Sequence, residues 1–361
     1  MEKSEKLFRD KETVKKLIGK LKEYKGKPLK LMEVCGTHTM SISRYGIRSV
    51  LPESIKLISG PGCPVCVTPN YYIRSALELA RRSDAIITTF GDMMRIPAGD
   101  TSLLDEKARG ADVRIVYSPL DSLEIAEKNP EKKVIFLSVG FETTIPVAAL
   151  AVLEAERRQI KNFMLLSANK TIDEALHILS SDKEIGVDGY IYPGHVSAII
   201  GDKLYREIAN QHGIPGIITG FEPVEILAAI IRLTELISNE KAAVENLYAR
   251  VVKPEGNPIA LSKVYEVFEN CDAAWRGLGL IPSSGLRLKE KFKGFDAWEI
   301  FEGKGQEIDE ETPGCRCGDI LKGKCLPGEC GLFGTACTPE TPVGSCMVSS
   351  EGTCAAYYKY S

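Results

Sequence analysis

The feature that most constrains the fold is a regular alternation of short apolar runs and helical patterns up to about residue 250. The apolar runs are rich in Ile, Val and Leu, and they lie near residues 30–34, 55–58, 85–89, 113–117, 133–138, 162–167, 189–192 and 214–219. The helical patterns lie near residues 6–24, 71–82, 121–128, 145–158, 172–181, 197–210, 223–237 and 240–250. Because strands that alternate with helices pair in parallel and are covered by those helices, this pattern predicts an α/β fold.

Eight predicted strands are compatible with one barrel or with two open sheets. The motif "GFETT" follows the fifth strand and the similar motif "GFEPVE" follows the eighth, at Phe141 and Phe221, so the sequence contains a weak internal repeat. This repeat favours two doubly wound, mostly parallel sheets of about four strands each. We therefore predict two α/β domains of related topology, over residues 26–130 and 131–250. Residues 1–25 are predicted to form a helix that packs on the C-terminal domain.

The chain changes character after residue 250, where "KPEGNP" is typical of a linker and a further helix is predicted near residues 260–275. Seven of the eleven cysteines lie between Cys315 and Cys354, in a segment with many prolines and glycines and little periodicity. Such a segment cannot build a hydrophobic core by itself. Residues 251–361 are therefore predicted to form a helical linker and a C-terminal domain held together by a metal centre or by covalent links.

Composition places the chain among ordinary soluble proteins and argues against several classes. Of its 361 residues 44% are hydrophobic and 26% are charged, and the formal net charge is −3, which argues against a nucleic-acid binder or a basic membrane-surface protein. The N-terminus lacks the apolar core of a signal peptide, and no later stretch is apolar for long enough to span a bilayer. We therefore expect a cytoplasmic protein, in which many cysteines indicate metal or redox chemistry more often than structural disulfides. Dinucleotide-binding and phosphate-loop fingerprints do not occur, which argues against a dehydrogenase or a P-loop enzyme.

The ends of the predicted strands carry the unusual residues. The first strand runs into "CGTH", which contains Cys35 and His38, and the second runs into "GPGCPVC", which contains Cys63 and Cys66. In open α/β sheets, ligands bind beyond the carboxyl ends of the strands, and these ends share one edge of a parallel sheet. We therefore expect the four side chains to face one cleft.

Two interpretations of the Cys-x-x-Cys pair stay open. Cys63 and Cys66 precede a predicted helix, and a thiol near a helix N-terminus has a lowered pKa that suits redox chemistry. Together with Cys35, they instead suit an open metal site that keeps one position for a ligand or a partner. His38 is a candidate for a base, a hydrogen bond or a metal contact beside either kind of site.

Further candidates follow other strands, and each has a plainer interpretation. Glu142 in "GFETT" begins a helix whose N-terminus can bind an anion, or the motif can simply cap the helix. His195 in "PGHVS" and Asp92 in "FGDMMR" lie on the same predicted edge, where a functional role and a loop role are both open. We expect three other residues to be structural. Cys271 is expected on a helix, with its side chain in the protein core, and His177 and His212 are expected on the surfaces of helices.

The cysteine-rich segment reads "CRCGDILKGKCLPGECGLFGTACTPETPVGSCMVSSEGTC" and contains no histidine. Ligand sets made only of cysteine hold zinc or an iron–sulfur cluster. The paired Cys-x-x-Cys knuckles typical of zinc ribbons do not occur here, so a [4Fe–4S] cluster is favoured over zinc and over disulfides or free thiols. Four ligands leave a surplus of cysteines, and a redox-active disulfide beside the cluster is a natural companion.

Taken in order, seven motifs of this sequence resemble those of the HypD family of hydrogenase maturation proteins over nearly the whole chain. The motifs are "MEVCGTHT", "GPGCPVC", "TTFGDM", "GFETT", "PGHVS", "GFEP" and "PVGSCMVSSEGTC". The resemblance implies two α/β domains of related topology and a third domain that carries a [4Fe–4S] cluster. It also implies a scaffold for assembling the Fe(CN)2CO group of [NiFe] hydrogenases, with iron that carries cyanide and CO only transiently.

The resemblance implies partners as well. One is a HypC-type chaperone, and the other is a HypE-type protein that processes carbamoyl groups and donates cyanide. We expect the chain to be a monomer within heteromeric complexes and to bind neither nucleic acid nor membranes.

The resemblance further implies roles for single residues. Cys35 would hold the iron together with a cysteine of the chaperone, and Cys63 and Cys66 would serve redox steps or contact the iron. The family's spacing selects four cluster ligands and leaves two cysteines for a redox disulfide similar to that of ferredoxin–thioredoxin reductase. The ligands are Cys315, Cys330, Cys337 and Cys354, and the disulfide pair is Cys317 and Cys346. Cys325 departs from this pattern and competes as a ligand or as a disulfide partner.

Within this interpretation, the cluster and the dithiol relay electrons, and His38 and Glu142 handle protons or donate hydrogen bonds to cyanide nitrogen. Ferrous iron that carries cyanide and CO favours soft thiolate ligands. Thr39 and Met40 stand where many members of the family have Glu or His, which weakens an acid–base role beside Cys35.

Two other functions stay open. One is a stand-alone iron–sulfur thiol–disulfide oxidoreductase, in which a cluster reduces the Cys63/Cys66 pair. The other is a zinc-stabilised interaction module with inert cleft cysteines. Cys35 and its "CGTH" turn favour the scaffold, because they have no role in a simple dithiol relay.

Overall fold

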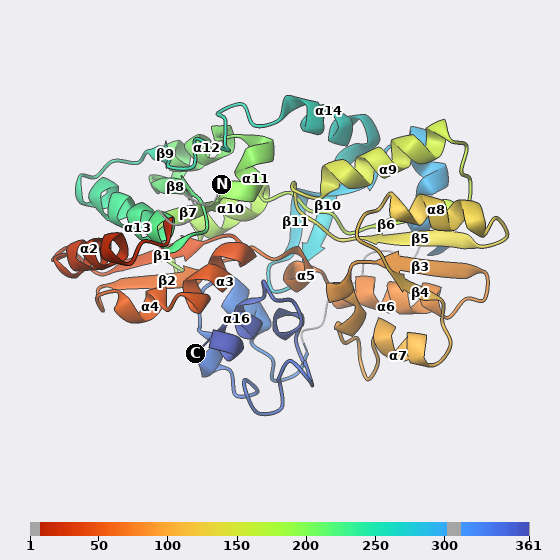
Figure 1. Ribbon diagram of the computed structural model, residues 1–361, viewed down its shortest axis with the longest axis horizontal. Helices are drawn as coiled ribbons and strands as arrows, with labels where there is room; N and C mark the ends of the chain where they lie inside the picture. The colour runs from red at the N-terminus through yellow and green to blue at the C-terminus, as the bar shows by residue number, and fades with distance from the viewer. Residues whose placement is uncertain (1–7, 302–311, 361) are drawn as a thin grey trace.

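The computed structural model describes residues 8–301 and 312–360 and contains two open parallel sheets on either side of a β-hairpin (Figure 1). The cysteine-rich C-terminal segment lies between the two sheets at the lower centre of this view. Helices alternate with the parallel strands along the chain, so the predicted α/β class with mostly parallel sheets is confirmed.

The first sheet has five parallel strands in the order β2-β1-β7-β8-β9. These strands are β1 (Leu29–Glu33), β2 (Ile55–Ser59), β7 (Gly189–Pro193), β8 (Gly216–Thr219) and β9 (Val244–Asn246). Every residue of β7 and β8 is buried, which is the expected result for apolar runs covered on both faces. β1 lies second from one edge of this sheet, between β2 and β7, and β7 is the central strand.

The second sheet has four parallel strands in the order β4-β3-β5-β6. They are β3 (Ala85–Thr89), β4 (Val113–Ile115), β5 (Lys133–Ser138) and β6 (Phe163–Ser167). β3 and β5 form its buried centre, whereas β4 is an edge strand whose last residue, Ile115, is exposed.

The two sheets do not divide the chain at residue 130, so the predicted boundary between residues 26–130 and 131–250 is wrong. The chain forms β1 and β2, then builds the whole second sheet, and returns to add β7, β8 and β9 to the first sheet. The return places Leu31 of β1 opposite Gly189 of β7, 158 residues later in the sequence. Periodicity marks where strands lie but not which strands become neighbours, and the long-range pairing decided this point.

Helices cover both sheets and match most of the predicted helical patterns. They are α2 (Lys11–Lys22), α3 (Gly36–Arg44), α4 (Ile47–Val50), α5 (Pro64–Val67), α6 (Asn70–Ala80), α7 (Leu103–Ala108), α8 (Asp121–Lys128), α9 (Ile145–Arg157), α10 (Asp173–Ser181), α11 (Gly194–Ile200), α12 (Lys203–His212), α13 (Pro223–Ser238), α14 (Pro258–Val267), α15 (Cys317–Leu321) and α16 (Thr353–Tyr360). Short 3₁₀ turns join them: η1 (Gly91–Arg95), η2 (Glu290–Phe295), η3 (Ala297–Phe301), η4 (Pro327–Glu329) and η5 (Ser345–Met347).

Two predicted helices are wrong because tertiary pairing overrides local propensity. The segment 240–250 contains β9, in which Val244 is buried and pairs with Gly216 of β8. The helix predicted over 260–275 ends at Val267, and the chain continues as β10 (Phe268–Trp275), which pairs antiparallel with β11 (Gly279–Leu288). Cys271 therefore lies on a partly exposed strand rather than in the core of a helix.

The N-terminal helix α2 packs on α13, so its predicted position on the C-terminal domain is wrong. Its apolar stripe ends in Leu21, which is 1% exposed and joins the core beneath the first sheet. The Nζ of Lys20 lies 2.7 Å from Oε1 of Glu235 on α13. The periodicity of α2 predicted its apolar face, but the partner of that face depends on where the chain returns as α13.

The C-terminal segment touches the carboxyl edge of the first sheet through short elements. α16 packs on α3, and η5 packs on α5 (Figure 1). Those two helices follow β1 and β2 directly, so the segment covers the ends of both strands. Within the described residues, no helix has the length and apolar character that crossing a bilayer requires.

Candidate functional site

The "CGTH" and "GPGC" turns lie against each other, as their place at one sheet edge predicted. Cys35 precedes the first turn of α3 and is 8% exposed. The backbone N–H of Gly36 donates to the carbonyl oxygen of Gly62 over 3.1 Å. A Cβ atom on Gly62 would lie 2.3 Å from the nitrogen of Cys35, so only glycine permits this approach.

Burial controls the protonation of Cys35. It raises the pKa of this thiol to about 12, and the nearby Glu351 carboxylate raises it further. The backbone N–H groups of His38 and Thr37 act in the opposite direction and lower the pKa, but they do not outweigh burial. Cys35 is therefore a neutral thiol near pH 7, and it becomes a thiolate ligand only when a metal cation displaces the proton.

His38 is a buried neutral imidazole with one free acceptor nitrogen. Its Nε2 lies 2.9 Å from the carbonyl oxygen of Gly220, which requires the proton to be on Nε2. Nδ1 is buried and has no hydrogen-bond partner among the described residues. Burial lowers the pKa of His38 to about 4, so the ring offers an acceptor rather than a positive charge at neutral pH.

His195 joins His38 around one aromatic ring. The ring of Phe221 lies 4.6 Å from the His38 ring and 4.2 Å from the His195 ring, measured between centroids. Burial lowers the pKa of His195, and the Glu351 carboxylate acts in the opposite direction. The "PGHVS" and "GFEP" motifs thus meet the "CGTH" motif here, and His195 lies beside His38.

Glu351 is a site residue that the sequence analysis missed. Its Oε1 accepts a hydrogen bond from the hydroxyl of Thr37 over 2.6 Å, and its charge acts on Cys35 and His195. A Cβ atom on Gly36 would lie 2.5 Å from Cβ of Glu351, so the glycine of "CGTH" makes room for this residue. Glu351 stands in the "PVGSCMVSSEGTC" motif, but its place 314 residues after Thr37 gave no signal of this contact.

The two thiols of the Cys-x-x-Cys motif lie close together at the start of a short helix. Cys63 precedes α5, and its Sγ lies 2.8 Å from the Sγ of Cys66 and accepts from the backbone N–H of Cys66 over 3.3 Å. Burial raises the pKa of the Cys66 thiol, so the lowered pKa expected for a helix N-terminus is wrong for this residue. The four residues of α5 provide little dipole against complete burial.

A second close thiol pair lies beside the first. The Sγ atoms of Cys317 and Cys346 are 2.8 Å apart, and the thiol of Cys346 also contacts that of Cys66. The hydroxyl of Ser345 donates to the backbone oxygen of Cys66 over 3.1 Å and holds the two pairs together. The predicted pairing of Cys317 with Cys346 is therefore sterically available, and the pair lies next to the Cys-x-x-Cys motif.

Six cysteines line one small cavity in the C-terminal segment, which we call the cysteine cavity. They are Cys315, Cys317, Cys330, Cys337, Cys346 and Cys354. Leu332, Phe333 and Met347 close its walls with apolar side chains. Burial raises the pKa of Cys354, and the neighbouring cysteines raise it further.

The cysteine cavity has the donor set that an iron–sulfur cluster uses. The four expected cluster ligands all line it, and an all-cysteine donor set with an apolar shell is what [4Fe–4S] clusters use. Among the described residues, no group of three or more His, Cys, Asp or Glu side chains is arranged to hold one metal ion. Cys325 lines a different groove, beside β2 with Arg48 and Tyr357.

The five thiols from Cys63 to the cysteine cavity form a continuous series, which we call the thiol path. It runs through Cys63, Cys66, Cys346, Cys317 and Cys315. Each neighbouring pair of thiols in this order is in contact, and the last three thiols, Cys346, Cys317 and Cys315, line the cysteine cavity. The sequence predicted both thiol pairs, but their contact depends on how the C-terminal segment docks.

Glu142 does not join these residues. It lines a separate cavity beside α9, α10 and α14, together with Thr171 and Tyr265. Its Oε1 accepts from the backbone N–H of Ile172 over 2.9 Å. The reason lies in the topology: "GFETT" follows β5 of the second sheet, whereas "CGTH" follows β1 of the first.

Asp92, His177 and His212 make contacts that join neighbouring elements of the fold. Asp92 accepts from the hydroxyl of Ser349 over 2.8 Å, which ties η1 to the C-terminal segment. His177 and His212 lie on α10 and α12 as predicted, but they face each other, with 3.0 Å between Nδ1 of the first and Nε2 of the second.

Comparisons with known proteins agree over nearly the whole chain. The family model described as "HypD: Hydrogenase formation hypA family" matches residues 12–361. The hydrogenase maturation factor HypD of Cupriavidus necator is 44% identical over 363 residues, covering 98% of this chain and 96% of that protein. HypD of Escherichia coli K12 is 43% identical over 361 residues, with the same coverage. A putative hydrogenase expression/formation protein of Methanocaldococcus jannaschii is 43% identical over 354 residues, covering 97% of this chain and 98% of that protein.

Proposed function

The chain belongs to the HypD family of hydrogenase maturation factors, and from this premise we propose that it is a scaffold for assembling the Fe(CN)2CO group of [NiFe] hydrogenases. The observation that carries the proposal is the thiol path, which connects the cysteine cavity to the turn beside Cys35. A maturation factor that adds strong-field ligands to iron needs both an iron thiolate and a nearby source of electrons. The path and Cys35 supply these two parts within one site.

In this proposal, Cys35 holds the iron that is being assembled. Ferrous iron displaces the thiol proton and gains a soft thiolate ligand. His38 and Glu351 lie around the same turn, where Nδ1 of His38 accepts a hydrogen bond and the Glu351 carboxylate holds or passes a proton. We propose that a cysteine of a HypC-type chaperone supplies a further ligand to this iron.

Cys315, Cys330, Cys337 and Cys354 are the residues that would hold a [4Fe–4S] cluster, which supplies single electrons next to the Cys317/Cys346 pair. Thiol–disulfide exchange then conveys reducing equivalents between the two pairs. A Cys346 thiolate attacks a Cys63–Cys66 disulfide at Cys66, and Cys317 resolves the mixed disulfide. Two electrons and two protons thereby move to Cys63 and Cys66, and a Cys317–Cys346 disulfide remains.

The proposed partners follow from the same chemistry. The chaperone shares the iron with Cys35, and a HypE-type protein delivers cyanide to it. We propose a cytoplasmic protein that acts as one copy within such complexes.

Infrared spectroscopy of the complex, co-purified anaerobically with its HypC-type chaperone, tests the proposal. We expect stretches of iron-bound cyanide and CO in the wild-type complex and their loss in Cys35→Ala. The matched control is Cys271→Ala, which removes a partly exposed cysteine of β10 that contacts neither thiol pair. Undiminished bands in Cys35→Ala would contradict the assignment of the iron thiolate.

The contact between the two thiol pairs favours one second candidate, a stand-alone thiol–disulfide oxidoreductase. That function needs no Cys35 and no chaperone. A complex with intact cluster, iron and both partners but without cyanide and CO bands, together with turnover of a disulfide substrate by Cys35→Ala, would favour it over the scaffold.

A further inference from the structure

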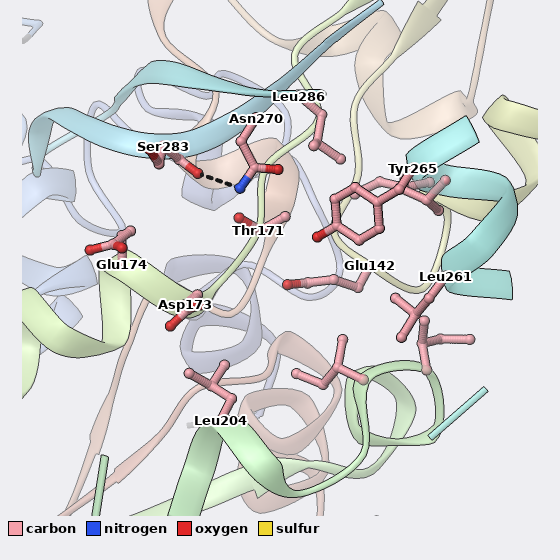
Figure 2. Close-up of a pocket in the computed structure, with 14 residues that line it drawn as sticks. Glu142, Thr171, Asp173, Glu174, Leu204, Leu261, Tyr265, Asn270, Ser283 and Leu286 are labelled. Carbon is pink, nitrogen blue, oxygen red and sulfur yellow. Dashed lines mark hydrogen bonds between the residues drawn. The ribbon is translucent and has the colours of Figure 1, made fainter. Parts of the chain in front are cut away.

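A second cavity lies away from the thiols, between the two sheets (Figure 2). It has a volume of about 220 Å³, which corresponds to about seven water molecules at about 30 Å³ each. Its walls come from the start of α9, the turn before α10, the helices α11, α12 and α14, and the hairpin β10–β11. The cavity therefore has the size of a small molecule or of one long side chain.

The lining of this cavity combines apolar walls with acidic groups. The apolar residues are Ile145, Ile199, Ile200, Leu204, Leu261, Val264 and Leu286. The acidic residues are Glu142, Asp173 and Glu174, and among the residues that the structure describes no Lys, Arg or His lines the cavity. The charge of the lining thus favours a cation, and the walls favour a cation that carries an apolar body.

Glu142 is the polar centre of this cavity. Its side chain is 7% exposed, and Oε1 accepts from the backbone N–H of Ile172. Oε2 is buried and has no hydrogen-bond partner among the described residues. In Figure 2 the carboxyl group of Glu142 points into the cavity, between Thr171 and the ring of Tyr265. A buried carboxylate oxygen without a donor is costly, so this atom indicates a ligand that donates to it.

The remaining polar groups are arranged around the same space. Asp173 lies at the rim, where its side chain is 52% exposed and its Oδ1 is 3.6 Å from Nε2 of His177. Asn270 donates to the backbone oxygen of Ser283 over 3.3 Å, which leaves the side-chain oxygen of Asn270 as an acceptor. The hydroxyl of Tyr265 lies on the side of the cavity toward Glu142. These groups offer acceptors to a ligand with several N–H donors.

We propose that this cavity binds a primary ammonium group carried on a short apolar chain, with Oε2 of Glu142 as its principal acceptor. A primary ammonium has three donors, and a hydrogen bond that joins two opposite charges in a buried site is stronger than a neutral one. The alkyl portion packs against the Ile and Leu side chains and removes them from water. The source is either a free small amine or a lysine side chain of a partner protein.

The proposal is independent of the iron site, because no cysteine of the thiol path or of the cysteine cavity lines this pocket. Loss of amine binding would leave the assignment of Cys35 untouched, and loss of the infrared bands would leave this proposal untouched.

Isothermal titration of the anaerobically purified full chain with n-butylammonium chloride tests the proposal. We expect saturable binding, and we expect no saturable binding of 1-butanol, which matches the probe in shape but has no charge. Glu142→Gln keeps the shape of the side chain and should weaken binding by about tenfold or more. The control is Glu124→Gln, an exposed acidic residue of α8, which should bind as the wild type does.

A second variant keeps the test decisive if Glu142→Gln alters folding. Val264→Phe adds bulk to the apolar wall and should abolish binding while circular dichroism stays that of the wild type. Nα-acetyl-lysine methylamide separates the two sources: binding at least as tight as that of butylammonium indicates a lysine side chain, and weaker binding indicates a free amine. Absence of saturable butylammonium binding, equal binding of 1-butanol, or unchanged affinity in Glu142→Gln would overturn the proposal.

Discussion

At the scale of single residues, burial determines the charge of the two titratable side chains in the "CGTH" turn. It raises the pKa of Cys35 to about 12 and lowers the pKa of His38 to about 4, so both are neutral near pH 7. Glu351, which is only partly buried, lies beside them and is the acidic group of the site. A site built this way has little charge of its own and gains a thiolate only when a cation arrives.

The hydrogen bond between Thr37 and Glu351 is expected to hold the C-terminal segment on α3. Thr37→Val keeps the shape of the side chain but leaves the Glu351 carboxylate without this donor. We expect a loss of about 1–2 kcal/mol in the free energy of unfolding, because the bond involves a charged acceptor that is only partly buried. Urea unfolding under anaerobic conditions measures it. Thr335→Val removes an exposed hydroxyl and should change the free energy by less than about 0.5 kcal/mol; equal losses in the two variants would contradict the expectation.

Glu142 should make stability depend on pH. Burial raises its pKa to about 7, above the usual value of 4.5, so the folded protein binds a proton that the unfolded chain has released between these values. The contribution to stability is fully present below about pH 4.5 and is lost as the pH rises through about 7, by at most about 3 kcal/mol. Melting temperatures of wild type and Glu142→Gln, measured between pH 5 and pH 8 in amine-free buffers, should converge toward low pH and diverge toward high pH, where the wild type becomes the less stable of the two. A wild-type pH dependence that Glu142→Gln leaves unchanged would contradict this sign and cause.

At the scale of elements, the apolar faces of helices and strands followed from periodicity, but their partners did not. α2 and α13 are about 200 residues apart in sequence and share one core with Leu21. The segment 240–250 has a helical pattern and yet forms β9, because its Val244 completes the edge of the first sheet. Local propensities are small, and burial against a distant element outweighs them.

Leu21→Ala should weaken the packing of α2 on α13. The side chain is 1% exposed, and removing a fully buried leucine typically costs about 2–5 kcal/mol, the larger values where the cavity does not collapse. We expect the lower part of this range, since a terminal helix can shift to fill the space. Thermal unfolding measures the loss, and Lys22→Ala on the exposed face of the same helix is the control. A melting temperature for Leu21→Ala equal to that of Lys22→Ala would mean that α2 does not pack as described.

At the scale of the whole molecule, the site forms because the chain leaves the first sheet and later returns to complete it. The first sheet is begun by β1 and β2 and completed by β7, β8 and β9, and the C-terminal segment then closes over the ends of β1 and β2. This order brings "CGTH", "GPGCPVC", "PGHVS" and "SSEGTC" to one place. The cysteine cavity lies in a segment with short helices and turns, and we expect the order of this segment to depend on the proposed cluster.

Cys330→Ser should therefore release iron and loosen the C-terminal segment, whereas Cys325→Ser should do neither. Cys330 lines the cysteine cavity, and Cys325 lines the groove beside β2. Iron and acid-labile sulfide per chain measure the first effect. Hydrogen exchange of α16, compared with that of β5 in the second sheet, measures the second. Full iron content in Cys330→Ser, or loss of iron in Cys325→Ser, would contradict the assignment of the ligands.

The sequence pattern alone was sufficient for the α/β class and for all eight predicted strands. These features are local, because apolar periodicity follows from the covering of a strand or helix. The roles of the cysteines in the C-terminal segment came from the family resemblance and stay predictions. The "CGTH" and "GPGC" turns were also predictable as neighbours, because adjacent parallel strands end at one edge.

Tertiary structure alone decided which strands share a sheet, where α2 packs, that Glu351 reaches Thr37 and that Glu142 faces a cavity of its own. Each of these depends on contacts between segments far apart in the chain, and their geometry follows from burying the whole core at once rather than from any local pattern. The residues of this protein indicate which chemistry is available. The return of the chain to its first sheet, and the docking of its last segment on that sheet, determine which of those residues meet.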